Sequence, residues 1–255
     1  MFFCVIGIGF SFNTLAASVT VFSTNFNIVL PAEINAGTAQ LAGVQGFNGL
    51  GPSGNQFSGN FLRSATGNTV SLSLTNLPTH DTISLSFLFA AIDSLDGTGT
   101  FPQGDFFKIV FDGNTLFSES FANALASQTQ SYVPPNNVEL ARRQDLGFSN
   151  GFFFLDSAYN FGADPVFSDF SHTNSSALIE FFIFGPGNQS LDDESWAMDN
   201  LEVSVFTKGD VSEVPVPPAI LLFGSGLLGF IGLKKRSKRT LYFLKGRSPN
   251  RLGIF

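Results

Sequence analysis

The sequence predicts an all-β protein: a two-sheet antiparallel β-sandwich of jelly-roll type, followed by one C-terminal transmembrane helix. Apolar and polar residues alternate through much of Val19–Phe206, as in Thr69–Leu74 and Ile83–Phe89. No window of helical length carries a capped amphipathic stripe, apart from a short turn predicted at Phe121–Gln128. Half-buried strands need a second layer, and a second sheet is the simplest one.

Further strands follow from the same alternation, and loops rich in Gly, Asn, Ser and Asp separate them. The tripeptide Asp112-Gly113-Asn114 predicts a hairpin turn between two strands. We expect any functional site in the loops, because loops tolerate the irregular backbone that sites need. The predicted strands are Phe106–Phe111, Thr115–Ser118, Phe152–Leu155, Ala177–Phe184 and Leu201–Phe206, and the predicted loops are Gly46–Asn60, Asp93–Asp105 and Gly185–Ser195.

The composition predicts an aromatic core and an acidic surface. The chain is 44% hydrophobic and has 32 Phe, so rings must fill most of the interior, with Trp196 among them. Between Glu33 and Glu213 lie five basic and 20 acidic residues, a net charge of 5 − 20 = −15. Such a body repels phosphate backbones and offers no basic patch, which argues against nucleic acid and favours divalent cations as partners.

The N-terminal segment predicts export. Residues Met1–Ala17 read as a signal peptide, with an apolar run and small residues before a cleavage point near Ser18. The usual positive charges before the apolar run are missing, so either the start is assigned too late or this segment is a buried strand. Cys4, the single cysteine, lies within it, so the mature β-sandwich domain, residues 18–206, has no disulfide.

The C-terminal segment predicts a membrane anchor. A linker at 207–218 contains a proline block that stops helix and strand alike. Residues 219–233 carry no charge and as a helix span roughly 22 Å, against a hydrocarbon core of about 30 Å. The basic cluster that follows predicts a cytoplasmic tail at 234–255, with the sandwich on the other side of the membrane. This cluster consists of Lys234, Lys235, Arg236, Lys238 and Arg239.

These C-terminal features closely resemble the PEP-CTERM sorting signal of Gram-negative bacteria. The resemblance rests on the motif Val214, Pro215, Val216 and Pro217, on Leu221–Gly229 and on the basic cluster. It implies that an exosortase cuts near the motif and passes the protein to the cell surface or matrix, often in strains that make exopolysaccharide. Val216 stands where the family has glutamate, so an uncleaved single-pass protein of the inner membrane is the alternative.

The body resembles lectin-like or jelly-roll sandwiches of such anchored proteins, through Asp93–Gly97, Gly104–Phe107 and Ser195–Leu201. The resemblance implies a structural Ca²⁺ held by Asp93, Asp96, Asp105 and Asp199. Acid-rich glycine loops supply the oxygen ligands that Ca²⁺ prefers, although the spacing is not that of an EF-hand. The alternative is that these residues form Asx turns at strand ends.

The functional prediction is a non-enzymatic surface or matrix protein that binds calcium and glycan. The two histidines, His80 and His172, are predicted to be solvated or to support a site indirectly, which leaves little for a histidine triad or a zinc site. The alternative is a glycan-active hydrolase, since two carboxylates about 5–10 Å apart suffice for glycoside hydrolysis. Its densest candidates are Asp192, Asp193 and Glu194.

Overall fold

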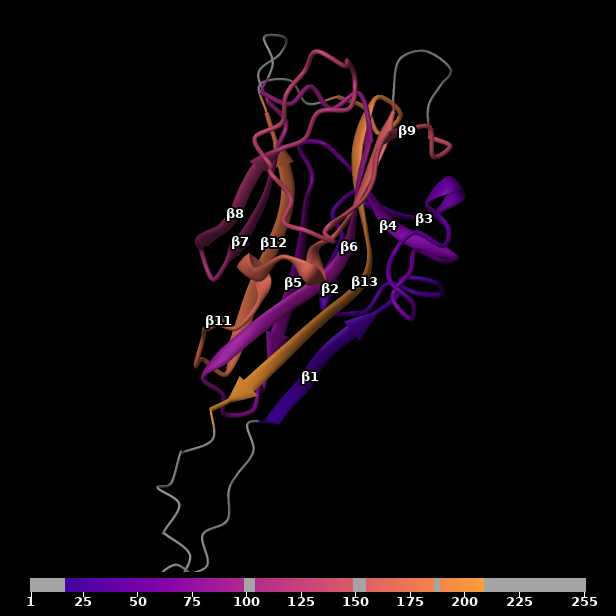
Figure 1. The fold of residues 1–255 in the computed structure, drawn as a ribbon. Helices are drawn as coiled ribbons and strands as arrows, with labels where there is room; N and C mark the ends of the chain where they lie inside the picture. The colour runs from indigo at the N-terminus through magenta and orange to yellow at the C-terminus, as the bar shows by residue number, and fades with distance from the viewer. Residues whose placement is uncertain (1–16, 99–103, 149–154, 186–188, 209–255) are drawn as a thin grey trace, which may run out of the picture. The chain divides into compact units, whose positions relative to one another are not determined.

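The computed structural model describes residues 17–98, 104–148, 155–185 and 189–208, and in this part the chain forms two antiparallel sheets (Figure 1). The first sheet has the order β3-β4-β13-β6-β10-β9, with β1 paired to β13 and β11 to β6; the second has the order β2-β5-β12-β7-β8. The first sheet comprises β3 (Gln40–Gly43), β4 (Asn60–Ala65), β13 (Glu194–Thr207), β6 (Thr82–Asp93), β10 (Asp156–Asn160), β9 (Glu139–Gln144), β1 (Ala17–Thr24) and β11 (Phe170–Ser171). The second comprises β2 (Ile34–Asn35), β5 (Thr69–Thr75), β12 (Ser176–Phe184), β7 (Phe106–Phe111) and β8 (Asn114–Ser120). Short 3-10 turns occur at η1 (Gln45–Phe47), η2 (Phe161–Ala163) and η3 (Pro165–Phe167).

The main core lies between the two sheets; 14 of its 33 buried residues are aromatic, fewer than the composition predicts, and aliphatic side chains make up most of the rest. Phe89 of the first sheet and Phe107 of the second have ring centroids 4.3 Å apart. Phe161 stacks on Phe89 at 5.0 Å, and Trp196 is fully buried beside Phe107. The predicted two-sheet sandwich is therefore confirmed, while its jelly-roll connectivity stays a prediction.

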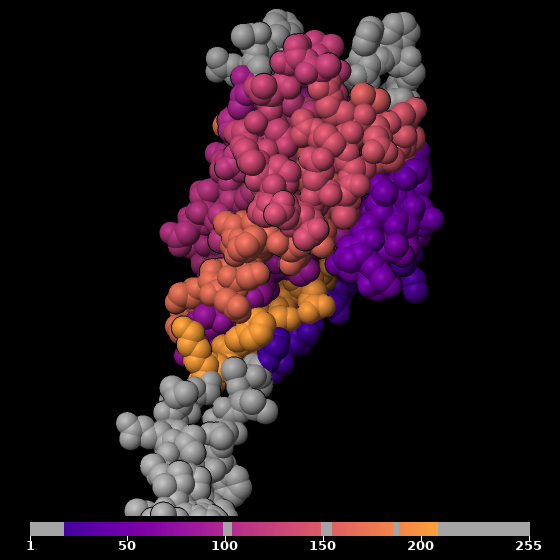
Figure 2. All heavy atoms as spheres, viewed as in Figure 1, coloured from indigo at the N-terminus to yellow at the C-terminus, as the bar shows by residue number. Residues whose placement is uncertain are grey.

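A second, smaller cluster covers the outer face of the first sheet. Phe47 and Phe57 pack on Phe61, and Phe148 completes the group. The segment that carries Phe47 and Phe57 forms part of the purple protrusion at the side of the molecule in Figure 2. This half of the sheet is thus buried on both faces, so its strands have few exposed positions.

Burial on both faces explains why two predicted strands are too short. The strand predicted at Ile83–Phe89 runs on to Asp93, and the strand predicted at Leu201–Phe206 begins at Glu194. In these extensions almost every side chain is buried, so alternation disappears. A register shift between Asp199 and Glu202 also interrupts the period of β13.

The other local predictions have mixed outcomes. The hairpin turn is confirmed, because Asp112 and Gly113 both have positive φ, 47° and 78°, as such a two-residue turn requires. The short turn predicted at Phe121–Gln128 is present only in its second half, where the Gln128 amide donates to the Leu125 carbonyl at 3.1 Å, while Ala122 forms a bridge with Asp96. The strand at Phe152–Leu155 falls almost entirely outside the described residues.

The predicted export and sorting segments lie outside the described residues. These are the signal peptide, the Val214–Pro217 motif, the apolar run at 219–233 and the basic cluster from Lys234 to Arg239. In the part of the chain that the structure describes, no helix is long and apolar enough to cross a membrane.

Candidate metal centre

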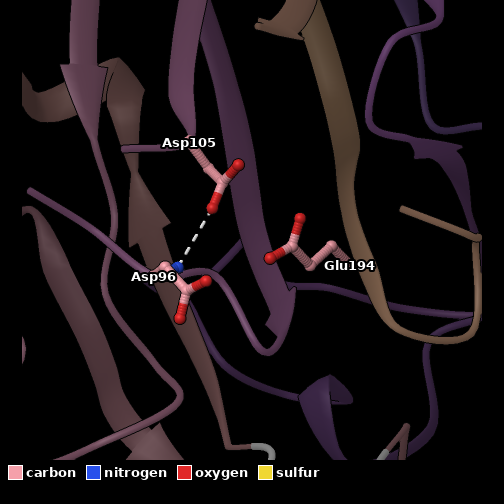
Figure 3. A group of neighbouring side chains, drawn as sticks. All are labelled: Asp96, Asp105 and Glu194. Atoms are coloured by element: carbon pink, nitrogen blue, oxygen red, sulfur yellow. Dashed lines mark hydrogen bonds between the residues drawn. The ribbon is translucent and has the colours of Figure 1, made fainter. Parts of the chain in front are cut away.

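Three carboxylates from separate parts of the chain meet at one end of the sandwich (Figure 3). Glu194 is the first residue of β13, Asp105 directly precedes β7, and Asp96 lies in the connection from β6 to β7. One oxygen from each side chain lies within 4.8 Å of the other two. Glu194 is two residues before Trp196 of the inter-sheet core, so strand alternation directs its carboxylate inward.

Hydrogen bonds hold this cluster but leave one oxygen of Glu194 without a partner. The Asp96 amide donates to Oδ2 of Asp105 at 3.0 Å, and Gln128 Nε2 donates to Oδ1 of Asp96 at 2.5 Å. Gln189 Nε2 donates to Oε1 of Glu194 at 2.8 Å. Glu194 is fully buried, and its Oε2 accepts no hydrogen bond. An unpaired buried acceptor costs about 1–3 kcal/mol, and more when charged, so this oxygen needs a proton or a cation.

The electrostatics of the cluster lead to the same requirement. Burial, followed by the charges of Asp105 and Asp96, raises the pKa of Glu194 to about 9. Burial also raises the pKa of Asp105 and that of Asp96, against the hydrogen bonds that those carboxylates accept. Within the described residues, no basic side chain forms an ion pair with any of the three. Without a cation, the cluster therefore retains a proton at neutral pH.

The donor set fits a hard divalent cation. All three ligand groups are carboxylates, which suit Ca²⁺, Mg²⁺ or Mn²⁺ rather than the softer metals. Three carboxylate oxygens that all lie within 4.8 Å of one another can bind one such ion together. Gly185 packs closely on this group, since a Cβ added to it would lie only 2.8 Å from Oδ1 of Asp105.

Asp93, which the sequence groups with these ligands, belongs to a different cluster. It forms an ion pair with Arg63 at 3.3 Å, and its backbone amide donates to Asp156. Burial and the charge of Asp156 raise the pKa of Asp93 to about 8, while Arg63 opposes the rise. Arg63 also donates to Ser195 Oγ at 3.0 Å and lies over the Phe148 ring. This cluster supplies its own cation.

Asp199 lies elsewhere on β13 and holds a loop. Its Oδ2 accepts from the Ser58 amide at 3.1 Å, and its Oδ1 accepts from the Asn200 amide at 2.7 Å. Burial raises the pKa of Asp199 to about 7. The structure therefore unites two of the four predicted ligands, Asp96 and Asp105, and adds Glu194.

Sequence reasoning assigns Glu194 to a hydrolytic pair rather than to the metal site. A signal for the metal role exists, because Glu194 and Trp196 share one face of a strand, and that face is in the core. Of its acidic neighbours, Asp192 is exposed, and Asp193 accepts a hydrogen bond from Ser94. The predicted run of three acids is thus divided between the interior and the surface.

A groove of about 650 Å³ lies beside the bulge in β13. Its polar lining includes the amides of Asn25, Asn55 and Asn200 and the hydroxyl of Ser86. Glu202 is the one charged residue among those that line the groove. The surface it offers is therefore rich in neutral hydrogen-bonding groups.

No protein-family model matches the chain, and no curated protein matches it. Among solved structures, a family GH115 4-O-methyl-α-glucuronidase with specificity for decorated arabinogalactans has a TM-score of 0.34 and 11% identity, over 72% of this chain and 17% of its own. A family 35 carbohydrate-binding module from Clostridium thermocellum has a TM-score of 0.29 and 12% identity, over 74% of this chain and 98% of its own. Likenesses this distant carry no inference about function.

Proposed function

We propose that this chain is an exported, non-enzymatic bacterial surface or matrix protein whose β-sandwich binds Ca²⁺ through Asp96, Asp105 and Glu194. The observation that carries the proposal is the partnerless, fully buried Oε2 of Glu194 beside two other carboxylates. A cation here joins the start of β13 in one sheet to the residue before β7 in the other. The ion would thus hold the two sheets together.

Thermal unfolding of the full-length protein tests the calcium site. A ligand that binds only the folded state stabilises by about 2.7 kcal/mol at 100 times its Kd, which is a rise in Tm of roughly 5–10 °C for a domain of this size. We expect that rise with Ca²⁺, a smaller one with Mg²⁺ and reversal by a chelator. Equal Tm in chelator and in excess Ca²⁺ contradicts the proposal.

Glu194→Gln separates loss of the ion from loss of the fold. In the metal-free protein at neutral pH Glu194 already holds a proton, because its pKa is raised to about 9, so a neutral Gln replaces a neutral acid. We therefore expect Glu194→Gln to melt close to metal-free wild type and to gain little from Ca²⁺. The matched control is Glu180→Gln on β12, which should keep the full calcium effect.

Glycan binding is a second candidate, favoured by the groove beside β13. Amides, hydroxyls and one carboxylate suit the vicinal hydroxyls of a neutral sugar, and the groove has no cation to hold an anionic ligand. Glu202 already accepts from Thr20 and Ser204 at 3.1 and 3.0 Å, which orients its carboxylate. An exopolysaccharide is the expected ligand class.

A panel of neutral polysaccharides tests this candidate by affinity electrophoresis. Glu202→Ala should abolish retardation, while Glu180→Ala, on the other sheet, should not. The hydrolase alternative is assayed on the same panel with wild type, Asp193→Ala and Glu194→Ala. Turnover by wild type that either variant abolishes contradicts the non-enzymatic assignment.

Export and sorting are part of the proposal and rest on the sequence features at the two ends of the chain. Mass spectrometry of the mature protein from the native host tests them. Loss of the segment after the Val214–Pro217 motif supports exosortase processing and transient residence in the inner membrane. An intact tail with Lys234–Arg239 identifies the uncleaved single-pass alternative.

A further inference from the structure

His80 and His172 form a buried, hydrogen-bonded pair at the end of the sandwich where β13 finishes. Their rings meet edge to edge and are nearly coplanar, with centroids 4.9 Å apart and planes inclined by 23°, and their exposures are only 3% and 7%. His80 lies between β5 and β6, and His172 directly follows β11. The sequence predicts that these side chains are solvated or support a site indirectly. Solvation is wrong, because both rings are buried and hydrogen-bonded to each other.

All four ring nitrogens have partners. His80 Nε2 lies 2.7 Å from His172 Nδ1. At the outer ends, His80 Nδ1 lies 2.5 Å from the Pro78 carbonyl oxygen and His172 Nε2 lies 3.2 Å from Oδ2 of Asp112. The result is one continuous chain from a carbonyl through two imidazoles to a carboxylate.

The partners determine how many protons the chain holds. A backbone carbonyl and a carboxylate can only accept, so both outer nitrogens must carry a proton. The inner contact needs one proton between its two nitrogens. That makes three N–H groups on two rings, whereas two neutral imidazoles carry two. We propose that the pair binds one excess proton, with its positive charge balanced by Asp112.

Other protonation states each break a contact. Removing the excess proton leaves a nitrogen lone pair facing an oxygen, and adding another places two N–H groups against each other within 2.7 Å. Of the charged groups nearby, Asp81 accepts instead from the Lys208 amide, and Asp169 accepts from Ser84. Asp112, held in place by the Leu178 amide at 2.8 Å, is therefore the counter-ion.

The pair lies close to the last residues of β13. The segment that carries His80 binds that strand end: the Asp81 amide donates to the Phe206 carbonyl at 2.8 Å, and Thr207 Oγ1 donates to the Thr79 carbonyl at 3.1 Å. The His172 amide donates to the Asp81 carbonyl at 3.2 Å. The histidine pair thus borders the hydrogen bonds that hold the end of β13.

Nitrogen-15 spectra of the histidine rings in the full-length protein count the protons directly. At about pH 7.5 we expect three protonated ring nitrogens and one unprotonated. In Asp112→Asn the amide oxygen should keep the Leu178 contact and turn its NH₂ to His172 Nε2, which then accepts, so the count falls to two. Two protonated nitrogens in wild type, or three in Asp112→Asn, overturns the proposal.

Discussion

Two buried carboxylates, Glu194 and Asp93, are register partners on adjacent strands, yet their surroundings differ. Asp93 has a positive φ of 64° and pairs with Arg63, which also contacts Ser195. The Glu194 carboxylate accepts from the Gln189 amide and lies beside Asp96 and Asp105. Each residue has one buried carboxylate oxygen without a hydrogen bond, but of the two only Asp93 has a basic partner among the described residues.

This difference is the reason that we assign the proposed cation to the cluster around Glu194. Both pKa values are raised, to about 8 for Asp93 and about 9 for Glu194, so the shift alone does not distinguish the two. The identity of the neighbour does: Arg63 lowers the pKa of Asp93, whereas Asp105 and Asp96 raise that of Glu194 further. Metal dependence should therefore follow Glu194 and not Asp93.

Arg63→Met should have the largest effect. It removes the hydrogen bonds that Arg63 donates to Asp93, Ser195 and the Leu191 carbonyl, and each buried acceptor left unpaired costs about 1–3 kcal/mol. It also removes the contact with the Phe148 ring. We expect the loss in chemical denaturation whether or not Ca²⁺ is present, because this cluster does not bind the ion.

Arg143→Met, which removes a partly exposed arginine, is the matched control for that experiment and should change stability by at most about 0.5 kcal/mol. Recovery of Arg63→Met by Ca²⁺ would mean that the two clusters act as one.

The pH dependence of stability should come next in size. The folded-state pKa of Glu194, about 9, exceeds its ordinary value of 4.5, so the folded state binds the proton more tightly than the unfolded chain does. Metal-free stability should therefore fall as pH rises from about 5 to about 9, by up to roughly 1.4 kcal/mol per pH unit for each titrating group. Denaturation in chelator across this range measures it.

Saturating Ca²⁺ should flatten that decline, because the ion replaces the proton, and Ca²⁺ affinity should itself increase with pH. Glu194→Gln should retain only the shallower slope of the other buried carboxyls whose pKa is raised, among them Asp93, Asp156 and Asp199. A slope identical to that of wild type would assign the titration to those other carboxyls instead.

The sequence predicts the fold well wherever one face of a strand is exposed to solvent. Strands β5, β7 and β12 alternate cleanly and are predicted within one residue at each end. Prediction fails where the outer cluster around Phe47 covers the first sheet, because burial on both faces removes the polar signal. Such coverage depends on loop packing, which sequence periodicity does not record.

The same limit applies to the sites. Asp96 and Asp105 can be proposed as ligands from sequence because they lie in glycine-rich loops, but Asp93 and Asp199 look equally suitable until their partners Arg63 and Ser58 are known. The histidine pair could not be foreseen, since 92 residues separate its members. Residue type predicts what chemistry is available, and long-range pairing decides where it is used.

Of these changes, Gly185→Ala should have the smallest effect, and that effect should be specific to Ca²⁺ binding. Its added Cβ would lie 2.8 Å from Oδ1 of Asp105 and 3.1 Å from the Gly104 carbonyl oxygen, so the carboxylate must shift. We expect about tenfold weaker Ca²⁺ binding by calorimetry, equivalent to about 1.4 kcal/mol, with little change in metal-free Tm. Gly43→Ala is the control, since its nearest neighbour would be 4.0 Å away. A lower metal-free Tm with unchanged Ca²⁺ affinity would show that the contact between Gly185 and Asp105 serves packing, and would remove Asp105 from the ligand set.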